Sequence, residues 1–294
     1  MNKMNVMVVF GGVSSEHPIS CISAASILRN IDKEKYTIYP VGITRDGAWR
    51  LIESEDFDSI EHDTWEQNDK TVPAVLSPDR KTHGLIVMRE TGTEIIHVDC
   101  VFPVMHGIGG PASALPVRTP PLRPLQRHVC APDRTQPAAR PPAQQPPWSD
   151  SCPSSRRMPQ RPGRHTGYVP SPADEEPTAT FAGEIAPSQE FYTFEAKYVD
   201  GTSGLYIPAH ISEKAMRTVR EDAVRVYRAL GCKGLSRVDF FCTYAEDEIV
   251  FNEINTIPGF TSISMYPKLQ EHMGLAYADL IDKLIGFAME RYDG

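Results

Sequence analysis

The stretch that decides the fold is a pair of β-rich runs near the C-terminus, LSRVDFFC (235–242) and EIVFNEIN (248–255). β-Branched and aromatic residues are frequent in both runs, as is typical of strands. The acidic residues around 245–247 leave room for only a short turn. The two strands are therefore predicted to form an antiparallel hairpin.

Polar side chains fall on one face of this hairpin. Side chains alternate along a strand, so Arg237 shares a face with Asp239, and Glu253 shares one with Asn255. If the hairpin joins these faces, Asp239, Glu253 and Asn255 present three oxygen donors, which suit Mg²⁺ together with phosphate oxygens and water. Arg237 adds a fixed positive charge for developing oxyanion or phosphate charge. The alternative is a solvent-facing strand face with ordinary ion pairs, but the aromatic residues imply a partly buried sheet, where unpaired carboxylates are costly.

Helices are predicted on both sides of the hairpin. Ser212 is a candidate N-cap, and apolar residues recur at steps of three and four from Met216 to Leu230 until Gly231 ends the helix. A last helix is expected over about 277–291, with an apolar stripe along one face. The loop after the hairpin, 256–262, contains Gly, Ser and Thr and offers N–H and hydroxyl donors beside the proposed metal.

The N-terminal part has the pattern of an open α/β sheet. Met4–Phe10 is predicted to be a buried strand, followed by a Gly11-Gly12 turn and a helix over 19–28. Further strands are expected at 37–43 and 95–104. The glycine turn places backbone N–H groups and a helix start at the carboxyl end of the first strand, the usual ligand edge of such a sheet.

Two polar residues lie at this edge. Glu16 follows the glycine turn, where a carboxylate can stabilise the helix start or receive the ammonium group of a ligand. His106 lies at the end of the predicted strand 95–104. It is either a site residue or a histidine whose hydrogen bonds are satisfied within the fold. Neither residue alone distinguishes a role in ligand binding from a role in the fold.

Length and composition restrict the class of protein. At about 150 residues per domain, 294 residues predict two domains. The net charge of -8 disfavours nucleic-acid binding through a basic surface. No apolar run is long enough for a membrane span or a signal peptide, so a cytoplasmic protein is expected. The six cysteines form no Cys-x-x-Cys pair, so neither a zinc site nor a disulfide framework is suggested.

Composition changes abruptly in the middle of the chain. Between 111 and 174 lie 16 of the 26 prolines and nine arginines, but no lysine, glutamate, isoleucine, phenylalanine or asparagine. Such a segment cannot bury enough apolar surface to offset the entropy of ordering it, so disorder is expected. A Pro/Arg-rich linker is one interpretation; the favoured one is translation out of frame, because the edges are abrupt.

Ordered motifs at both ends resemble those of the D-alanine–D-alanine ligases, members of the ATP-grasp superfamily. The N-terminal motifs are FGGVSSE (10–16) with Ser20, and VFPVMHG (101–107). The C-terminal motifs are GEI (183–185), EAKY (195–198), RVDF (237–240) and NEINTIPG (252–259) with Ser262 and Ser264. Any one motif is weak, but the ordered set covers most of 1–107 and 175–294.

The resemblance implies a fold and an activity. The fold would be an α/β N-terminal substrate-binding domain with an open, parallel-type sheet (1–107) and an ATP-grasp-like α+β catalytic domain (175–294). The activity would be ATP-dependent synthesis of D-alanyl-D-alanine for peptidoglycan, with Mg²⁺ or Mn²⁺. One D-alanine carboxylate would attack the γ-phosphate of ATP to give an acyl phosphate, and the amine of a second D-alanine would displace phosphate. A homodimer is expected from the family and from the Val/Ile-rich N-terminal segments.

The resemblance also implies roles for single residues. Glu16 would hold the first ammonium group, His106 would belong to the substrate site, and Tyr198 would lie in the lid. Lys197 would contact the transferred phosphate, and Ser264 would bind the second carboxylate. Arg237 and the backbone of Gly259 would stabilise the tetrahedral intermediate. The metal would be ligated by Asp239, Glu253 and Asn255. Tyr198 favours D-alanine as second substrate over D-lactate, whereas D-serine stays open.

The family pattern breaks at 108–174. The family expects a central domain with two ATP-contacting lysines, but no lysine occurs between Lys81 and Lys197. The central lobe is therefore expected to be missing or disordered, and little or no ligase activity is predicted. Two alternatives are a D-alanine–D-serine ligase relative and a non-catalytic remnant of a ligase; an ATP-grasp ligase with another substrate is disfavoured by Glu16 and the 197–198 pair.

Overall fold

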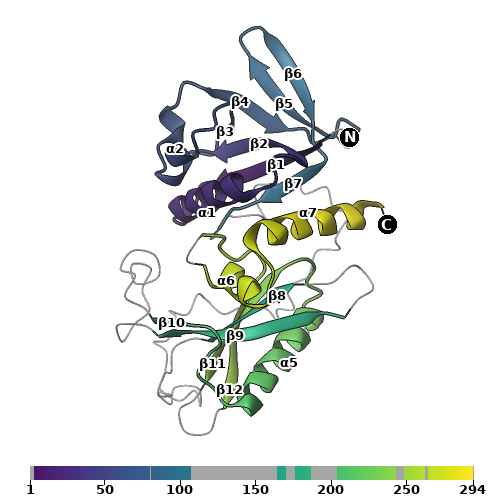
Figure 1. The fold of residues 1–294 in the computed structure, drawn as a ribbon. Coiled ribbons are helices and arrows are strands. Elements are labelled where there is room, and N and C mark those ends of the chain that lie inside the picture. The colour runs from purple at the N-terminus through teal and green to yellow at the C-terminus, as the bar shows by residue number, and fades with distance from the viewer. Residues whose placement is uncertain are drawn as a thin grey trace, which may run out of the picture.

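The computed structural model describes residues 3–79, 81–106, 164–169, 176–186, 204–242, 248–261 and 264–293. These residues form two sheets with helices packed on them (Figure 1). No helix in these ranges is both long enough and apolar enough to cross a membrane.

The first sheet is mixed, in the order β6-β5-β4-β3-β2-β1-β7. Its strands are β1 (Met4–Gly11), β2 (Tyr36–Ile43), β3 (Trp49–Ile52), β4 (Thr71–Leu76), β5 (Gly84–Arg89), β6 (Gly92–His97) and β7 (Cys100–Pro103). The predicted open, parallel-type sheet is confirmed at one end, where β1 pairs in parallel with β2 and β7, while β3 to β6 extend the sheet with antiparallel pairs. Three helical segments complete this part: α1 (His17–Asn30), α2 (Phe57–Glu61) and the short 3₁₀ helix η1 (Trp65–Gln67).

The single strand predicted over 95–104 is wrong. The structure divides it into β6, which forms a hairpin with β5, and β7, which joins β1 on the opposite side of the sheet. The division falls at Asp99, whose carboxylate accepts from the Asn5 backbone N–H at 2.7 Å and whose own N–H donates to the Asn5 carbonyl. The apolar pattern on both sides of Asp99 hid this change of partner.

The second sheet is antiparallel throughout, in the order β10-β9-β8-β11-β12. Its strands are β8 (Arg164–Val169), β9 (Thr178–Ala186), β10 (Gly204–Tyr206), β11 (Ser236–Cys242) and β12 (Ile249–Asn255). The predicted hairpin is confirmed as β11 and β12. α5 (Glu213–Ala229) packs on one face through Val219, Ala223 and Tyr227, which contact the buried Val238 and Phe240. As predicted, Ser212 caps α5 by accepting from the Ala215 N–H at 3.1 Å.

β8 lies inside 108–174, where disorder was expected, so that expectation is wrong for 164–169. These six residues, RHTGYV, contain no proline and include Thr, Tyr and Val, which favour strands. β8 pairs with β9 and β11 and so occupies the centre of the second sheet. The rest of the Pro/Arg-rich range lies outside the described residues.

One apolar core joins the two ends of the chain. α6 (Met265–His272) packs on β8 and β9, and α7 (Tyr277–Asp293) packs against α1 and β7. The largest buried cluster combines side chains of β1, α1 and β7 with Phe260, Tyr266 and the apolar face of α7. The Tyr277 hydroxyl donates to the Phe260 carbonyl at 2.7 Å and accepts from Ser26 of α1. The loop after β12 is thereby held against the N-terminal sheet.

Candidate functional site

The site is built where β1 and β7 end in parallel. Ser20 on the first turns of α1 accepts from the Gly11 N–H at 2.8 Å and donates to the Val104 carbonyl at 2.6 Å. One buried hydroxyl thus fixes the glycine turn after β1 to the chain that leaves β7. Gly11 and Gly12 have φ of +83° and +100°, a region that favours glycine, and a Cβ on Gly11 would lie 2.3 Å from the Ile43 carbonyl oxygen.

Glu16 occupies the N-cap position of α1 and is partly buried. Its side chain makes no capping hydrogen bond, while its backbone N–H donates to Ser14 Oγ at 3.1 Å. The carboxylate therefore does not serve as an ordinary side-chain cap. At the positive end of the helix it is placed to receive a cationic group.

His106 connects the two ends of the site. It lies just beyond β7, is 7% exposed, and its ring is hydrogen-bonded to the Ile257 backbone of the loop after β12. Burial lowers its pKa to about 4, an effect that the Arg237 guanidinium reinforces and the Ile257 hydrogen bond opposes. His106 is therefore a neutral side chain at pH 7, in contact with the C-terminal half of the chain.

The predicted oxygen donors share one face of the second sheet. Asp239 pairs directly with Glu253, and Arg237 pairs with Asn255. Val238 and Phe240 face α5, so Arg237 and Asp239 point to the opposite face. Directly opposed residues of an antiparallel pair have Cβ atoms about 4.5–5.5 Å apart, within reach of one ion.

A β-bulge keeps this face intact. The register shifts between Asp239 and Phe240, so that Phe240 pairs with Phe251 and Asn252 is the extra residue. The two phenyl rings then contact each other edge to face, with centroids 6.0 Å apart. Bulges re-aim side chains beside active sites, and this one puts the carboxylate pair and the phenyl pair on opposite faces. The hydrophobic pattern of the strands does not reveal it.

The charges of Arg237 and Asp239 are paired. Arg237 donates from Nε to Asp239 Oδ1 at 2.9 Å and from Nη2 to Oδ2 at 3.0 Å. Asp239 is 4% exposed, so this pairing offsets the burial of its charge. A carboxylate has about four acceptor positions, so the bond to Arg237 does not by itself exclude an additional ligand.

Glu253 and Asn255 complete the donor set. Glu253 is exposed and Asn255 partly buried, and the Asn255 amide oxygen accepts from the Ile257 N–H at 3.1 Å. Two carboxylates and an amide oxygen fit Mg²⁺, which prefers oxygen ligands and retains several waters. The sheet is less covered here than its aromatic residues suggested, because Phe241 and Phe251 are 39% and 45% exposed.

Gly259 and Ser264 face each other across the next loop. A Cβ on Gly259 would lie 3.0 Å from Ser264 Oγ. Ser264 Oγ accepts from the Thr261 N–H at 3.0 Å and lies 2.8 Å from Thr261 Oγ1. Ser264 was expected at the site from the resemblance, but its pairing with Thr261 was not, although the Thr-x-x-Ser spacing could have indicated it. Lys197 and Tyr198 lie outside the described residues.

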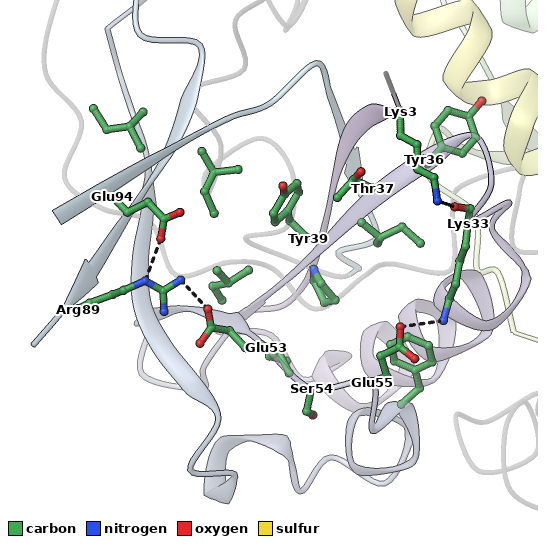
Figure 2. Close-up of a pocket in the computed structure, with 17 residues that line it drawn as sticks. Lys3, Lys33, Tyr36, Thr37, Tyr39, Glu53, Ser54, Glu55, Arg89 and Glu94 are labelled. Carbon is green, nitrogen blue, oxygen red and sulfur yellow. Dashed lines mark hydrogen bonds and ion pairs between the residues drawn. The ribbon is translucent and has the colours of Figure 1, made fainter. Parts of the chain in front are cut away.

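A groove on the N-terminal sheet lies away from these residues. It has a volume of about 680 Å³ on the N-terminal sheet and is bordered by the ion pairs Arg89–Glu53 and Lys33–Glu55 (Figure 2). None of the described candidate residues lines it. A smaller cavity of about 270 Å³ lies between β7, the loop after β12 and α7, beside the Ile257 backbone that His106 contacts.

Comparison with family models identifies both ends of the chain. The model of the D-ala D-ala ligase N-terminus matches residues 5–111, and that of the D-ala D-ala ligase C-terminus matches 169–286. The two matches leave 112–168 uncovered, which agrees closely with the Pro/Arg-rich range.

Similar proteins carry the same description. A D-alanine–D-alanine ligase of Caldicellulosiruptor bescii is 34% identical over 357 residues, covering 99% of this chain and 96% of its own length. That alignment is longer than the 294 residues of this chain, so part of the relative has no counterpart here. The solved VanG D-Ala:D-Ser ligase of Enterococcus faecalis has a TM-score of 0.70 at 27% identity, covering 97% of this chain and 99% of its own. The D-alanine-D-alanine ligase of Coxiella burnetii, at 23% identity, shares the fold with a TM-score of 0.71, covering 100% of this chain and 96% of its own.

Proposed function

Because the chain belongs to the D-alanine–D-alanine ligase family, whose members are ATP-dependent ligases, we propose that it is a form of this enzyme with impaired turnover. The reaction is the ligation of two D-alanines through an acyl phosphate, for peptidoglycan precursors in the cytoplasm. The observation that carries this proposal is the face shared by Asp239, Glu253 and Asn255, in register on β11 and β12.

The substrate side of the proposal rests on the ends of β1 and β7. Glu16, without a capping hydrogen bond, would hold the ammonium group of the first D-alanine. His106, neutral at pH 7, would contribute to the same substrate pocket without adding a second positive charge beside Arg237. Ser264 would receive the carboxylate of the second D-alanine at the N-terminus of α6, where backbone N–H groups favour an anion.

The phosphate side rests on β11 and the loop after β12. Asp239, Glu253 and Asn255 would hold Mg²⁺ or Mn²⁺, which supplies charge neutralisation for the nucleotide phosphates when bound. Arg237 and the Gly259 backbone would stabilise the negative charge of the tetrahedral intermediate. Lys197 and Tyr198 are assigned to the phosphate contact and the lid by family resemblance alone.

Impairment is proposed because the chain lacks candidates for the two nucleotide-binding lysines. No lysine stands between Lys81 and Lys197, and the family models leave 112–168 unmatched. We accordingly assign 1–107 to substrate binding, 175–294 to catalysis, and 108–174 to a segment read out of frame. The DNA sequence across codons 107 to 176 tests this origin: lysine-containing family motifs in another frame would support it.

The activity is tested by ATP- and Mg²⁺-dependent phosphate release with D-alanine. We expect turnover far below that of the Caldicellulosiruptor bescii relative under the same conditions. Turnover equal to the relative would contradict impairment, and complete absence of D-alanine and ATP binding would favour a non-catalytic remnant. Mass analysis of the product formed from mixed D-alanine and D-serine separates the two ligase activities, and light scattering tests the homodimer.

A further inference from the structure

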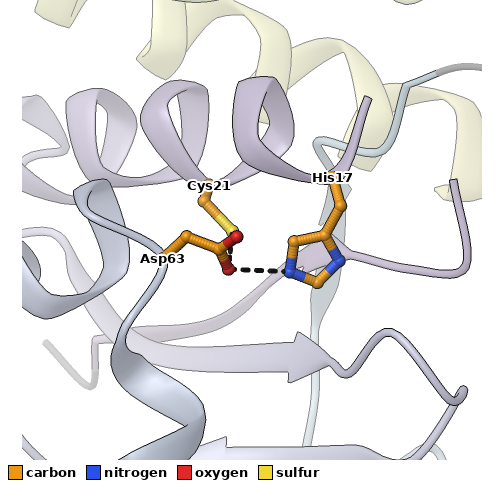
Figure 3. Close-up of side chains that lie close together, drawn as sticks. All are labelled: His17, Cys21 and Asp63. Atoms are coloured by element: carbon orange, nitrogen blue, oxygen red, sulfur yellow. Dashed lines mark hydrogen bonds and ion pairs between the residues drawn. The ribbon is translucent and has the colours of Figure 1, made fainter. Parts of the chain in front are cut away.

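A second cluster of ligand-type side chains lies under the start of α1. His17 Nε2, Cys21 Sγ and an Asp63 carboxylate oxygen all lie within 4.8 Å of one another (Figure 3). His17 and Cys21 are four residues apart on α1 and so project from the same face of the helix. Asp63 reaches them from the turn after α2 with a φ of 56°. None of the three belongs to the ligase site described above.

The imidazole is oriented to present Nε2 to the cluster. His17 Nδ1 lies 2.8 Å from the Gly12 carbonyl oxygen, which can only accept, so Nδ1 carries the proton. In the neutral ring, Nε2 then carries a lone pair and no proton, and this atom lies 3.1 Å from Asp63 Oδ1. Within the described residues, the buried Nε2 atom has no hydrogen-bond partner. A lone pair facing a carboxylate oxygen requires a cation between them, which is either a proton or a metal ion.

The distances fit a tetrahedral metal ion. Cys21 Sγ lies 3.7 Å from the same Asp63 Oδ1 that lies 3.1 Å from His17 Nε2. Zinc bonds of about 2.3 Å to sulfur and 2.0–2.2 Å to nitrogen and oxygen place tetrahedral ligand atoms roughly 3.3–3.6 Å apart. These two separations therefore lie within a few tenths of an ångström of tetrahedral ligand spacings, while His17 Nε2 and Cys21 Sγ lie within 4.8 Å of each other.

The surroundings resemble the outer shell of a metal site. Zinc-binding histidines usually donate their other ring N–H to a carbonyl or carboxylate, as His17 does to Gly12, and ligating carboxylates are themselves hydrogen-bonded. Asp63 Oδ2 is paired with Arg45. Asp63 is 19% exposed and Arg45 55% exposed, so an ion has an approach to the otherwise buried cluster.

We propose that His17, Cys21 and Asp63 form a binding site for a borderline-soft divalent cation, with Zn²⁺ as the best match. On binding, the Cys21 S–H bond breaks, the proton passes to solvent and an S–Zn bond forms; thiolate and carboxylate then balance the charge of the ion. His17 directly follows Glu16 and bonds to Gly12, so the ion would rigidify the turn that presents Glu16.

The test is titration of the full chain, freed of metal with a chelator, with Co²⁺ in excess Mg²⁺. A thiolate–Co²⁺ pair gives a charge-transfer absorption band in the near ultraviolet, which the oxygen donors on β11 and β12 cannot produce. We expect one such site per chain, displaced by Zn²⁺, which binds more tightly than Co²⁺. Absence of the band in the parent chain overturns the proposal and leaves a protonated His17–Asp63 pair.

Three variants locate the site. Cys21→Ser should abolish the band, whereas Cys100→Ser, which alters another buried cysteine, should keep it. Asp63→Asn keeps the thiol and should weaken Co²⁺ binding by at least about tenfold. Circular dichroism checks that each variant folds; if Cys21→Ser does not fold, Asp63→Asn decides. A band unchanged in Cys21→Ser, or unchanged affinity in Asp63→Asn, overturns the proposal.

Discussion

The two sheets hold their functional residues in different ways. β1 lies inside the first sheet, with Val6 to Phe10 fully buried, and its turn is tied to β7 by the buried Ser20. β12 is an edge strand whose Glu253 is exposed, and Arg237 pairs with Asp239 on the neighbouring β11. The proposed substrate side is therefore held by buried hydrogen bonds, whereas the proposed metal face lies on an edge hairpin with one exposed carboxylate. A nucleotide and the lobe that holds it would be needed to cover this face.

The largest effect is expected from restoring that lobe. Replacing 108–168 by the corresponding segment of the Caldicellulosiruptor bescii ligase should raise D-alanine-dependent phosphate release by at least about 10²-fold, because fixed positive charge on transferring phosphates contributes that much. The measurement is phosphate release at saturating ATP and Mg²⁺. Equal turnover of parent chain and chimera would show that 108–168 does not limit activity.

In that chimera, Asp239→Asn removes the negative charge of a buried carboxylate from the proposed metal face. We expect a loss of about 10²–10³-fold in turnover, since the ion and Arg237 both depend on this carboxylate. Asp222→Asn is the matched control, because Asp222 pairs only with the exposed Arg225 on α5 among the described contacts. Similar losses in the two variants would remove the metal face from the proposed mechanism.

The contact between the two halves predicts a pH dependence. The pKa of His106 falls from 6.5 to about 4 on folding, so the unfolded chain binds more protons between these values. The free energy of unfolding therefore decreases as pH falls through this window, by up to about 3 kcal/mol once pH is below both pKa values. Urea unfolding at pH 7 and pH 5 measures it.

His106→Gln should flatten this pH dependence, whereas His272→Gln, an exposed histidine on α6, should leave it unchanged. If His106→Gln retains the slope of the parent chain, another group controls the acid side of stability.

The substrate side should be sensitive to a single hydroxyl. Ser20→Ala removes the acceptor for the Gly11 N–H and the donor to Val104, both buried, and should lower the free energy of unfolding by about 1–3 kcal/mol. Ser26→Ala, which removes one partly buried bond to Tyr277, should have a smaller effect. Equal effects would mean that the glycine turn is not held by Ser20. Thermal and urea unfolding of both variants provide the comparison.

Most helices and strands could be predicted from local sequence patterns, whereas the errors arose where strand pairing depends on residues far apart in the chain. The N-cap of α5 at Ser212, its apolar spacing and the 235–255 hairpin are determined by neighbours in sequence, so they could be predicted. The division of 95–104 depends on Asp99 meeting Asn5, which lies far away in the chain. β8 was hidden because this six-residue strand lies within a range that was judged by its average composition.

The site shows the same limit. The shared face of Asp239, Glu253 and Asn255 follows from strand alternation, but the bulge at Asn252 that preserves it depends on the partner strand. The His17–Cys21–Asp63 cluster had one local signal, the spacing of four on a helix. Its third member comes from another element and needed the structure.

The smallest effect tests whether the second sheet is stabilised by local signals. Ser212→Ala removes the acceptor for the Ala215 N–H and should cost about 1 kcal/mol of stability, the usual value of an N-cap. Thr218→Ala is the control on the same helix, because among the described contacts its hydroxyl bonds only to the Lys214 carbonyl, in an exposed hydrogen bond within the helix. We expect it to be near neutral, since such bonds add little to helix stability. If both variants unfold alike in urea, α5 is held by its packing on Val238 and Phe240 alone, and the metal face then depends on tertiary contacts as much as the substrate side does.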